Sequence, residues 1–201
     1  MRLTIESVIL CMAVLLLLTA CSTPRVAKYP VADPAAGRTD LLAIEDWSFK
    51  GKMAVKSDQG NANLRVAWTQ NNEEFDLILS GLLGQVIARV KGEEGDVAVT
   101  TAEHGKMVSE DAESLFSEIW GWQLPVSQIP YWVRGLPAPD LPLQADYDSH
   151  GLLEELQQLG WQVRYLRYEG QLPVRLELIR SEVKLLLVVK EWTLKEPTNN
   201  D

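Results

Sequence analysis

Chemically reactive side chains are scarce in this chain of 201 residues. It has two cysteines, Cys11 and Cys21, and two histidines, His104 and His150. It has no Gly-x-Ser-x-Gly nucleophile motif, no phosphate-binding loop and no histidine–carboxylate cluster at metal-ligand spacing. Both histidines stand in polar, turn-like segments, where solvated side chains are the usual outcome. We therefore expect a protein that is not an enzyme, with no catalytic residue, no metal site and no dissociable cofactor.

Long apolar runs are also missing. The stretch from Val8 to Ala20 is apolar, but it is too short to cross a hydrocarbon core of about 30 Å as a helix. A short apolar segment before a small residue is typical of a signal peptide, here residues 1–20. The formal net charge of −9 argues against a nucleic-acid partner. Because anionic headgroups mildly repel an acidic body, membrane contact must come from attached lipid or from a local apolar feature.

The signal peptide ends at a distinctive motif. Leu18-Thr19-Ala20-Cys21 resembles the lipobox of bacterial lipoproteins, although an ordinary signal peptide with a nearby cysteine is the alternative. The resemblance implies cleavage before Cys21, an S-diacylglycerol on its sulfur and an N-acyl chain on the new amine. Several acyl chains anchor a protein stably, whereas one anchors it only marginally. The absence of Asp after Cys21 favours the outer membrane, again by resemblance.

The chain after Cys21 divides into a tether and one domain. Residues 21–39 hold Pro24, Pro30, Pro34 and Gly37 without an apolar period, which is typical of a flexible, extended tether. Residues 40–201 are long enough for a single domain with its own core. No thiol remains in this domain, so no disulfide can support it.

The first part of the domain alternates between apolar and polar residues. Trp47, Phe49, Met53 and Val55 share one face, and the lysines between them share the other. This period of two predicts an antiparallel meander that is apolar on one face. The five expected strands span residues 46–56, 62–69, 75–80, 85–91 and 97–101.

Helices and further strands follow. Apolar residues at helical spacing between Ser109, the expected cap, and Gly121 predict one helix, and Gln128–Arg134 predicts a short second one. The stretch Leu152–Leu159 fits either a helix or a strand. This order of elements indicates an α+β fold in which helices cover one face of a long curved antiparallel sheet. Later strands are expected at Leu141–Tyr147, Gln162–Tyr168, Val174–Arg180 and Lys184–Leu194.

Two features suggest binding. The tryptophans exceed what one sheet face commonly needs, so they fill a solid core or line an apolar cavity. Gly81-Leu82-Leu83-Gly84 places two leucines where a hairpin usually carries turn residues. This loop either folds back onto the sheet or stands out as an apolar membrane-insertion or partner-binding loop.

Several segments resemble, in order, the family of the outer-membrane lipoprotein receptor LolB. They are Phe75–Gly84, Ile129–Pro137, Gly160–Tyr165 followed by Leu172-Pro173, and the closing Val188–Lys195 strand. One departure is Leu82, where the family often has proline, which leaves the loop's shape open. The resemblance implies a LolA/LolB-like incomplete antiparallel β-barrel with a helical lid over an apolar cavity. It also implies that Leu83 is the protruding leucine linked to membrane insertion, and that Trp68, Trp132 and Trp161 face the cavity.

The implied function is lipoprotein transfer at the outer membrane. By resemblance, the protein faces the periplasm as a lipid-anchored monomer, accepts acylated lipoproteins from the LolA-type carrier and inserts them among outer-membrane lipids. The main alternative is a lipid-anchored structural or assembly protein of the envelope with a solid core. An envelope hydrolase is a distant third possibility, because the residues for hydrolysis are missing.

Overall fold

One antiparallel sheet dominates the protein. The computed structural model describes residues 40–93, 95–121 and 123–195, so the predicted signal peptide, Cys21 and the tether lie outside the described residues. The eleven strands are ordered β6-β5-β4-β3-β2-β1-β11-β10-β9-β8-β7. The strands are β1 (Trp47–Ser57), β2 (Gly60–Asn71), β3 (Glu74–Ser80), β4 (Val86–Glu93), β5 (Asp96–Thr101), β6 (Gly105–Ser109), β7 (Gln144–Tyr147), β8 (Leu153–Gln158), β9 (Trp161–Glu169), β10 (Leu172–Arg180) and β11 (Val183–Leu194).

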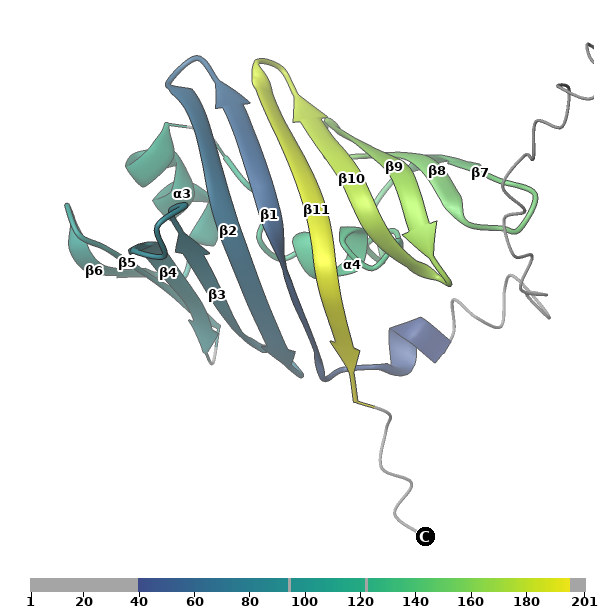
Figure 1. Ribbon diagram of the computed structural model, residues 1–201, viewed down its shortest axis with the longest axis horizontal. Helices are drawn as coiled ribbons and strands as arrows, with labels where there is room; N and C mark the ends of the chain where they lie inside the picture. Colours follow the sequence, from purple (N-terminus) through teal and green to yellow (C-terminus); the bar gives the residue numbers. More distant parts are fainter. Residues whose placement is uncertain (1–39, 94, 122, 196–201) are drawn as a thin grey trace, which may run out of the picture. The chain divides into compact units, whose positions relative to one another are not determined.

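The sheet is open, because β6 and β7 stand at its two ends rather than beside each other. The chain between these edge strands carries α3 (Ala112–Trp120) and α4 (Ile129–Trp132) and covers one face of the sheet (Figure 1). We call that side the helix face and the other side the helix-free face. An incomplete antiparallel barrel with a helical lid is therefore confirmed. None of the described helices has the length and apolar character needed to cross a membrane.

Alternation explains the core. Along part of each central strand every second residue is buried on the helix face, as in β2, where Val66, Trp68 and Gln70 alternate with exposed or half-buried neighbours. Trp47, Phe49, Trp68 and Trp192 form one aromatic group whose ring centroids lie 5.2 to 6.5 Å apart. Such contacts add about 0.5–1.5 kcal/mol per pair to the burial of area.

The structure decides the open question at Leu152–Leu159 and corrects several element boundaries. The stretch is strand β8, and a register shift against β7 turns Leu153 and Leu156 to the same side although they are three residues apart. Such a bulge imitates the spacing of a helix. Leu159 and Gly160 then adopt positive φ in a two-residue hairpin turn.

The helix cap was predicted at the wrong residue. Asp111, not Ser109, accepts a hydrogen bond from the Ser114 amide, and the Ser109 hydroxyl accepts one from the Asp111 amide instead. The second helix is shorter than predicted because only Ile129–Trp132 are helical. The strand expected at Leu141–Tyr147 begins only at Gln144, and edge strand β6 was not predicted.

Arg134 fastens the start of the domain to the helical lid. This arginine is 6% exposed, and its guanidinium donates to the backbone carbonyls of Leu41, Ile44 and Pro130 at 2.8–2.9 Å. It also lies 5.4 Å from the centre of the Trp47 ring, which is cation–π range. Burial lowers the pKa of Arg134. A buried charge that is held this way stabilises the fold only while all of its acceptors stay in place.

We predict that Arg134→Met lowers the free energy of unfolding by about 3 kcal/mol, because one buried and two half-buried carbonyls lose their donor and each loss costs on the order of 1 kcal/mol. The melting temperature should fall by about 6–12 °C. Thermal unfolding measures both quantities. Lys106→Met, at an exposed position of β6, is the control and should change stability by under about 0.5 kcal/mol. An equally small effect of Arg134→Met would contradict the fastening role.

Candidate functional site

An apolar cavity of about 320 Å³ lies between the sheet and the helical lid. Its volume is at the lower end of the range of small-molecule pockets. Polar residues gather where the cavity meets the β1–β2 turn, at Ser57, Gln59 and Asn61. Hence the helix face is not packed solid. The apolar wall comprises Phe49, Met53, Val55, Leu64, Val66, Trp68, Leu77, Leu79, Leu178, Leu185 and Leu187 from the strands and Phe116, Trp120, Leu124, Ile129 and Val133 from the lid.

Of the three tryptophans that were expected to face the cavity, one does so. Trp68 lines the cavity, but Trp132 and Trp161 do not. Trp132 is completely buried, and its indole nitrogen donates to Gln158 Oε1 at 2.9 Å. Trp161 is also buried and borders a separate, shallow pocket at the β8–β9 turn. Trp120, at the end of α3, lines the cavity instead. Its position four residues after Phe116 places both side chains on the same helix face, and this spacing in the sequence could have indicated its role.

Gln158 explains why Trp132 is held away from the cavity. The Gln158 side chain is buried, accepts from both Trp132 and the Ala138 amide, and donates to the Ala138 carbonyl at 2.9 Å. Tyr165 donates its hydroxyl to the Trp132 carbonyl at 3.0 Å. Burial holds the pKa of Tyr165 well above its usual value. These hydrogen bonds connect α4 to strands β8 and β9, so Trp132 has a structural role.

The loop between β3 and β4 stands out from the sheet. Leu83 is 96% exposed and Leu82 is 62% exposed. The Gly84 amide donates to the Gly81 carbonyl at 2.9 Å, so both leucines occupy the centre of a closed turn. Gly84 has φ of +91°, which favours glycine. The structure therefore resolves the alternatives in favour of an exposed loop, with Leu83 at the tip.

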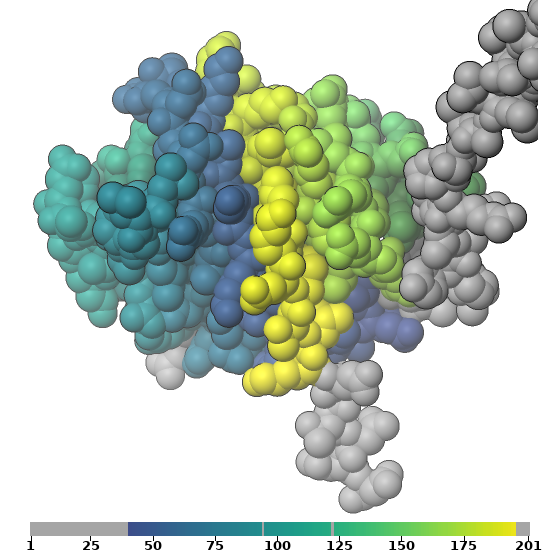
Figure 2. Space-filling model, in the orientation of Figure 1, coloured from purple at the N-terminus to yellow at the C-terminus, as the bar shows by residue number. Residues whose placement is uncertain are grey.

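Apolar surface continues from this loop to the cavity. Val86 and Ile87 follow the loop and are 59% and 39% exposed, and Ile87 also lines the cavity. The β3–β4 loop protrudes on the face shown in the space-filling view (Figure 2). Connected exposed apolar side chains of this kind mark surfaces that meet a membrane or a partner. This arrangement can pass an apolar chain between a surface and the cavity.

A second groove has a different character. With a volume of about 1170 Å³, it lies at the opposite end of the strands, by the β2–β3 and β4–β5 turns. Its lining includes Arg134 and five carboxylates, those of Glu45, Glu73, Glu74, Glu93 and Asp96. These charges suit water better than an acyl chain.

The histidines take no part in either site. The His104 amide donates to the Thr101 hydroxyl at 3.0 Å, and the His150 amide donates to Asp148 at 2.8 Å, both within exposed turns. In the part of the chain that the structure describes, no three His, Cys, Asp or Glu side chains are grouped to hold a metal ion.

Comparison with known proteins identifies the family. The family model described as "Outer membrane lipoprotein LolB" matches residues 45–192. The chain belongs to the LolB family. An outer-membrane lipoprotein LolB of Pseudomonas savastanoi pv. phaseolicola is 37% identical over 185 residues, which cover 88% of this chain and 90% of that protein. One of Pseudomonas putida is 37% identical over 161 residues, 78% of each chain.

Solved structures give a more distant comparison. Among solved structures, a LolA superfamily protein from Nitrosomonas europaea covers 81% of this chain and 93% of its own, with 10% identity and a TM-score of 0.49. The LolB family model spans the sheet from just before β1 to near the end of β11, including the lid and the exposed loop. The cavity and the loop therefore belong to the LolB-family part of the chain.

We predict that Ala62→Trp weakens binding of a fluorescent dansyl fatty acid by at least about tenfold, since a tenfold change needs only about 1.4 kcal/mol. Ala62 lines the cavity next to the β1–β2 turn, so the indole fills the space where the chain enters. Fluorescence titration measures the affinity. Ala67→Trp is the matched control, because Ala67 lies on the same strand but on the opposite face. Equal affinities of the two variants would show that the fatty acid binds elsewhere.

Proposed function

We propose that this LolB-family protein receives acylated lipoproteins from a LolA-type periplasmic carrier and inserts them into the outer membrane. The observation that supports the proposal best is the continuity between the apolar cavity and the exposed loop, joined through Ile87. A solid-core envelope protein would need neither a cavity nor an exposed leucine pair.

The cavity supplies the driving force for acceptance. An acyl chain that leaves the carrier moves toward the site where its contacts are better, and no nucleotide is needed. Each advantage of about 1.4 kcal/mol shifts the distribution tenfold toward this protein. The aromatic and branched side chains of the wall offer such contacts, while the polar turn at Ser57 to Asn61 leaves the entrance wet.

Delivery uses the loop. A leucine that leaves water for an apolar phase gains roughly 1.5–3 kcal/mol. This gain is small enough for Leu83 to touch the bilayer transiently and to withdraw. The closed turn from Gly81 to Gly84 presents the side chain before contact, so insertion costs little ordering of the loop.

The anchor keeps the domain at its membrane. Cys21 carries an S-diacylglycerol and an N-acyl chain in this proposal, and the protein hangs as a monomer from the outer membrane into the periplasm. Three acyl chains give stable attachment, since each buried methylene contributes about 0.8 kcal/mol. Attachment by lipid leaves the cavity free for cargo.

We predict that Leu83→Glu separates acceptance from delivery. The position is almost fully exposed, so the free energy of unfolding should change by under about 0.5 kcal/mol and the melting temperature should hardly shift. Cargo should still pass from carrier to variant, because the cavity is unchanged, but insertion into liposomes should fall at least about tenfold, since an ionised carboxylate resists the apolar phase.

Val108→Glu serves as the control for Leu83→Glu. Val108 is also exposed, but it lies on edge strand β6 away from the loop, and its variant should deliver normally. Full delivery by Leu83→Glu at normal stability would refute the role of the loop. Failure of the unmodified protein to accept acylated cargo at all would refute the proposed function itself.

We also predict that Cys21→Ala abolishes lipid attachment and releases the domain from membranes if another peptidase cleaves it. Mass spectrometry of the native N-terminal peptide tests this directly, with Ser22→Ala as the control that should retain its lipid. An unmodified Cys21 thiol in the native protein would disprove the anchor.

A further inference from the structure

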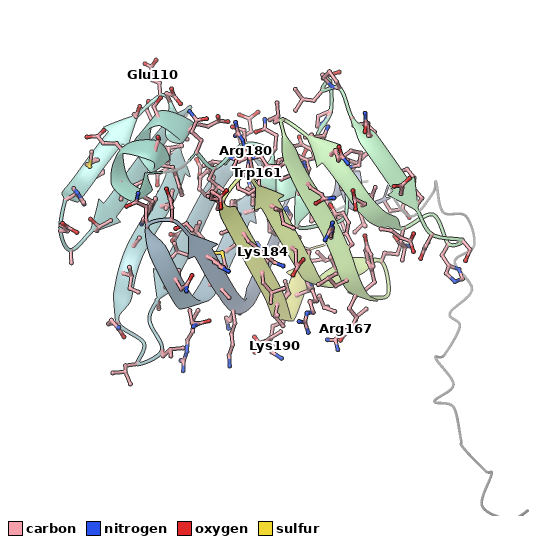
Figure 3. The ribbon with its side chains drawn as sticks, turned by 90° about the horizontal axis from the view of Figure 1, so that it is seen from above. Glu110, Trp161, Arg167, Arg180, Lys184 and Lys190 are labelled. Carbon is pink, nitrogen blue, oxygen red and sulfur yellow. The ribbon has the colours of Figure 1, made fainter. Side chains whose placement is uncertain are left out.

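Four basic side chains form a row across the helix-free face, although the whole chain carries a formal net charge of −9. Five residues of five neighbouring strands lie side by side in the strand register. In the order of the strands they are Arg65 of β2, Lys52 of β1, Val188 of β11, Arg175 of β10 and Arg167 of β9. We call Arg65, Lys52, Arg175 and Arg167 the cationic row. All four are exposed, and Figure 3 places Arg167 and Lys190 on the side away from α3.

This row lacks compensating charge. Within the described ranges, no carboxylate lies within ion-pair distance of Lys52, Arg65 or Arg175, and Arg167 meets only the exposed Glu169, at 3.2 Å. No acidic residue interrupts the row itself. The carboxylates of the second groove lie instead at the end of the strands near Asn72 and Gly95.

Two pairs in the row oppose like charges directly across neighbouring strands, Arg65 with Lys52 and Arg175 with Arg167. Such cross-strand pairs destabilise a sheet. From Arg65 to Arg167 the row crosses four strand spacings, or roughly 19 Å at about 4.8 Å each. Within each directly opposed pair the charges therefore lie inside a Debye length of about 8 Å, and the two pairs are separated by about 10 Å across Val188, so all four act on the same stretch of an external anionic surface.

The cationic row begins beside the exposed loop. Arg65 is paired in register with Ser80, and Gly81, the next residue, opens the turn that holds Leu82 and Leu83. In Figure 1 this dark teal loop curls toward the viewer in front of β4, on the face that carries no helix. A flat surface that touches Leu83 from this side also approaches the row.

We infer that the cationic row binds the headgroups of anionic phospholipids and sets the helix-free face toward the bilayer when Leu83 inserts. The inference rests on the proposed function, which brings the protein to a membrane. Basic side chains near an anionic surface each add a favourable electrostatic contribution, and the row combines this with the apolar contact of Leu83. The repulsion expected from net charge is reduced at the row, because acidic residues of the same face are held in ion pairs with other basic residues, such as Asp76 with Arg89 and Glu177 with Lys184.

Binding to vesicles tests the row without cargo or carrier. The protein is produced from Ser22 onward, so that no acyl chain is attached; the compact unit from Val31 to Asp201 is retained. Flotation compares vesicles of equal parts phosphatidylcholine and phosphatidylglycerol with vesicles of phosphatidylcholine alone. The test variant combines Lys52→Gln, Arg65→Gln and Arg175→Gln.

The variant should bind the anionic vesicles at least about tenfold more weakly, with little change on phosphatidylcholine. Its melting temperature should be unchanged or higher, because opposed like charges are removed. The matched control combines Lys106→Gln, Arg180→Gln and Lys195→Gln, which changes net charge equally outside the row, and should retain most of the binding.

Equal loss in the two triple variants would show a general effect of charge and overturn the inference, as would no loss in the test variant. The inference would also be overturned if the test variant bound vesicles normally but accepted cargo poorly from the carrier in an assay without vesicles. That result would show that the row contacts the carrier. Dansyl fatty acid binding is measured in parallel on the same unmodified protein. If the fatty acid does not bind, the proposed function fails, whatever the vesicles show.

Discussion

The pairing of β1 with β11 is the interaction on which the rest of the structure depends. It joins the meander β1–β6 to the strands β7–β10, which otherwise share no neighbouring strand. Gly51 sits at the register shift in this pairing, where a Cβ atom would lie 2.5 Å from the Val188 carbonyl oxygen. Next to this close approach, the ring centroids of Phe49 and Trp192 lie 5.2 Å apart. The aromatic group therefore includes residues from both halves of the chain.

An open sheet of this width creates a surplus of apolar surface on one face. The described residues of the lid between β6 and β7 form a nine-residue helix and a four-residue helix, too little to fill the helix face. Trp132 of α4 is completely buried outside the cavity, whereas the cavity itself extends along the strands to the β1–β2 turn. An empty apolar cavity lowers the stability of the fold. In the proposed function the same cavity is the binding site for the acyl chains of the cargo.

Sequence patterns predicted the central strands and the two lid helices well, and the strands near the edges of the sheet less well. Residues such as Val66 and Trp68 alternate in a strand that is buried on one side, so the pattern reports their environment directly. Leu153 and Leu156 depend on a bulge formed with β7, which no local pattern reveals. The exposure of Leu83 could be anticipated, because two glycines enclose it. The burial of Trp132 could not, because its partner Gln158 lies 26 residues away. The cationic row was equally hidden, since its members come from four strands and meet only through the register.

The two free edges of the open sheet bear on how the protein behaves in a crowded compartment. A strand edge offers unpaired backbone donors and acceptors to any other extended chain and is a common starting point for aggregation. Here the edges are β6, with five residues, and β7, with four; these are the two shortest of the described strands. Long strands such as β1, β2 and β11 lie in the middle, where both of their edges are paired. An open barrel built in this way keeps its mouth accessible while offering little backbone for unwanted pairing with partly unfolded neighbours.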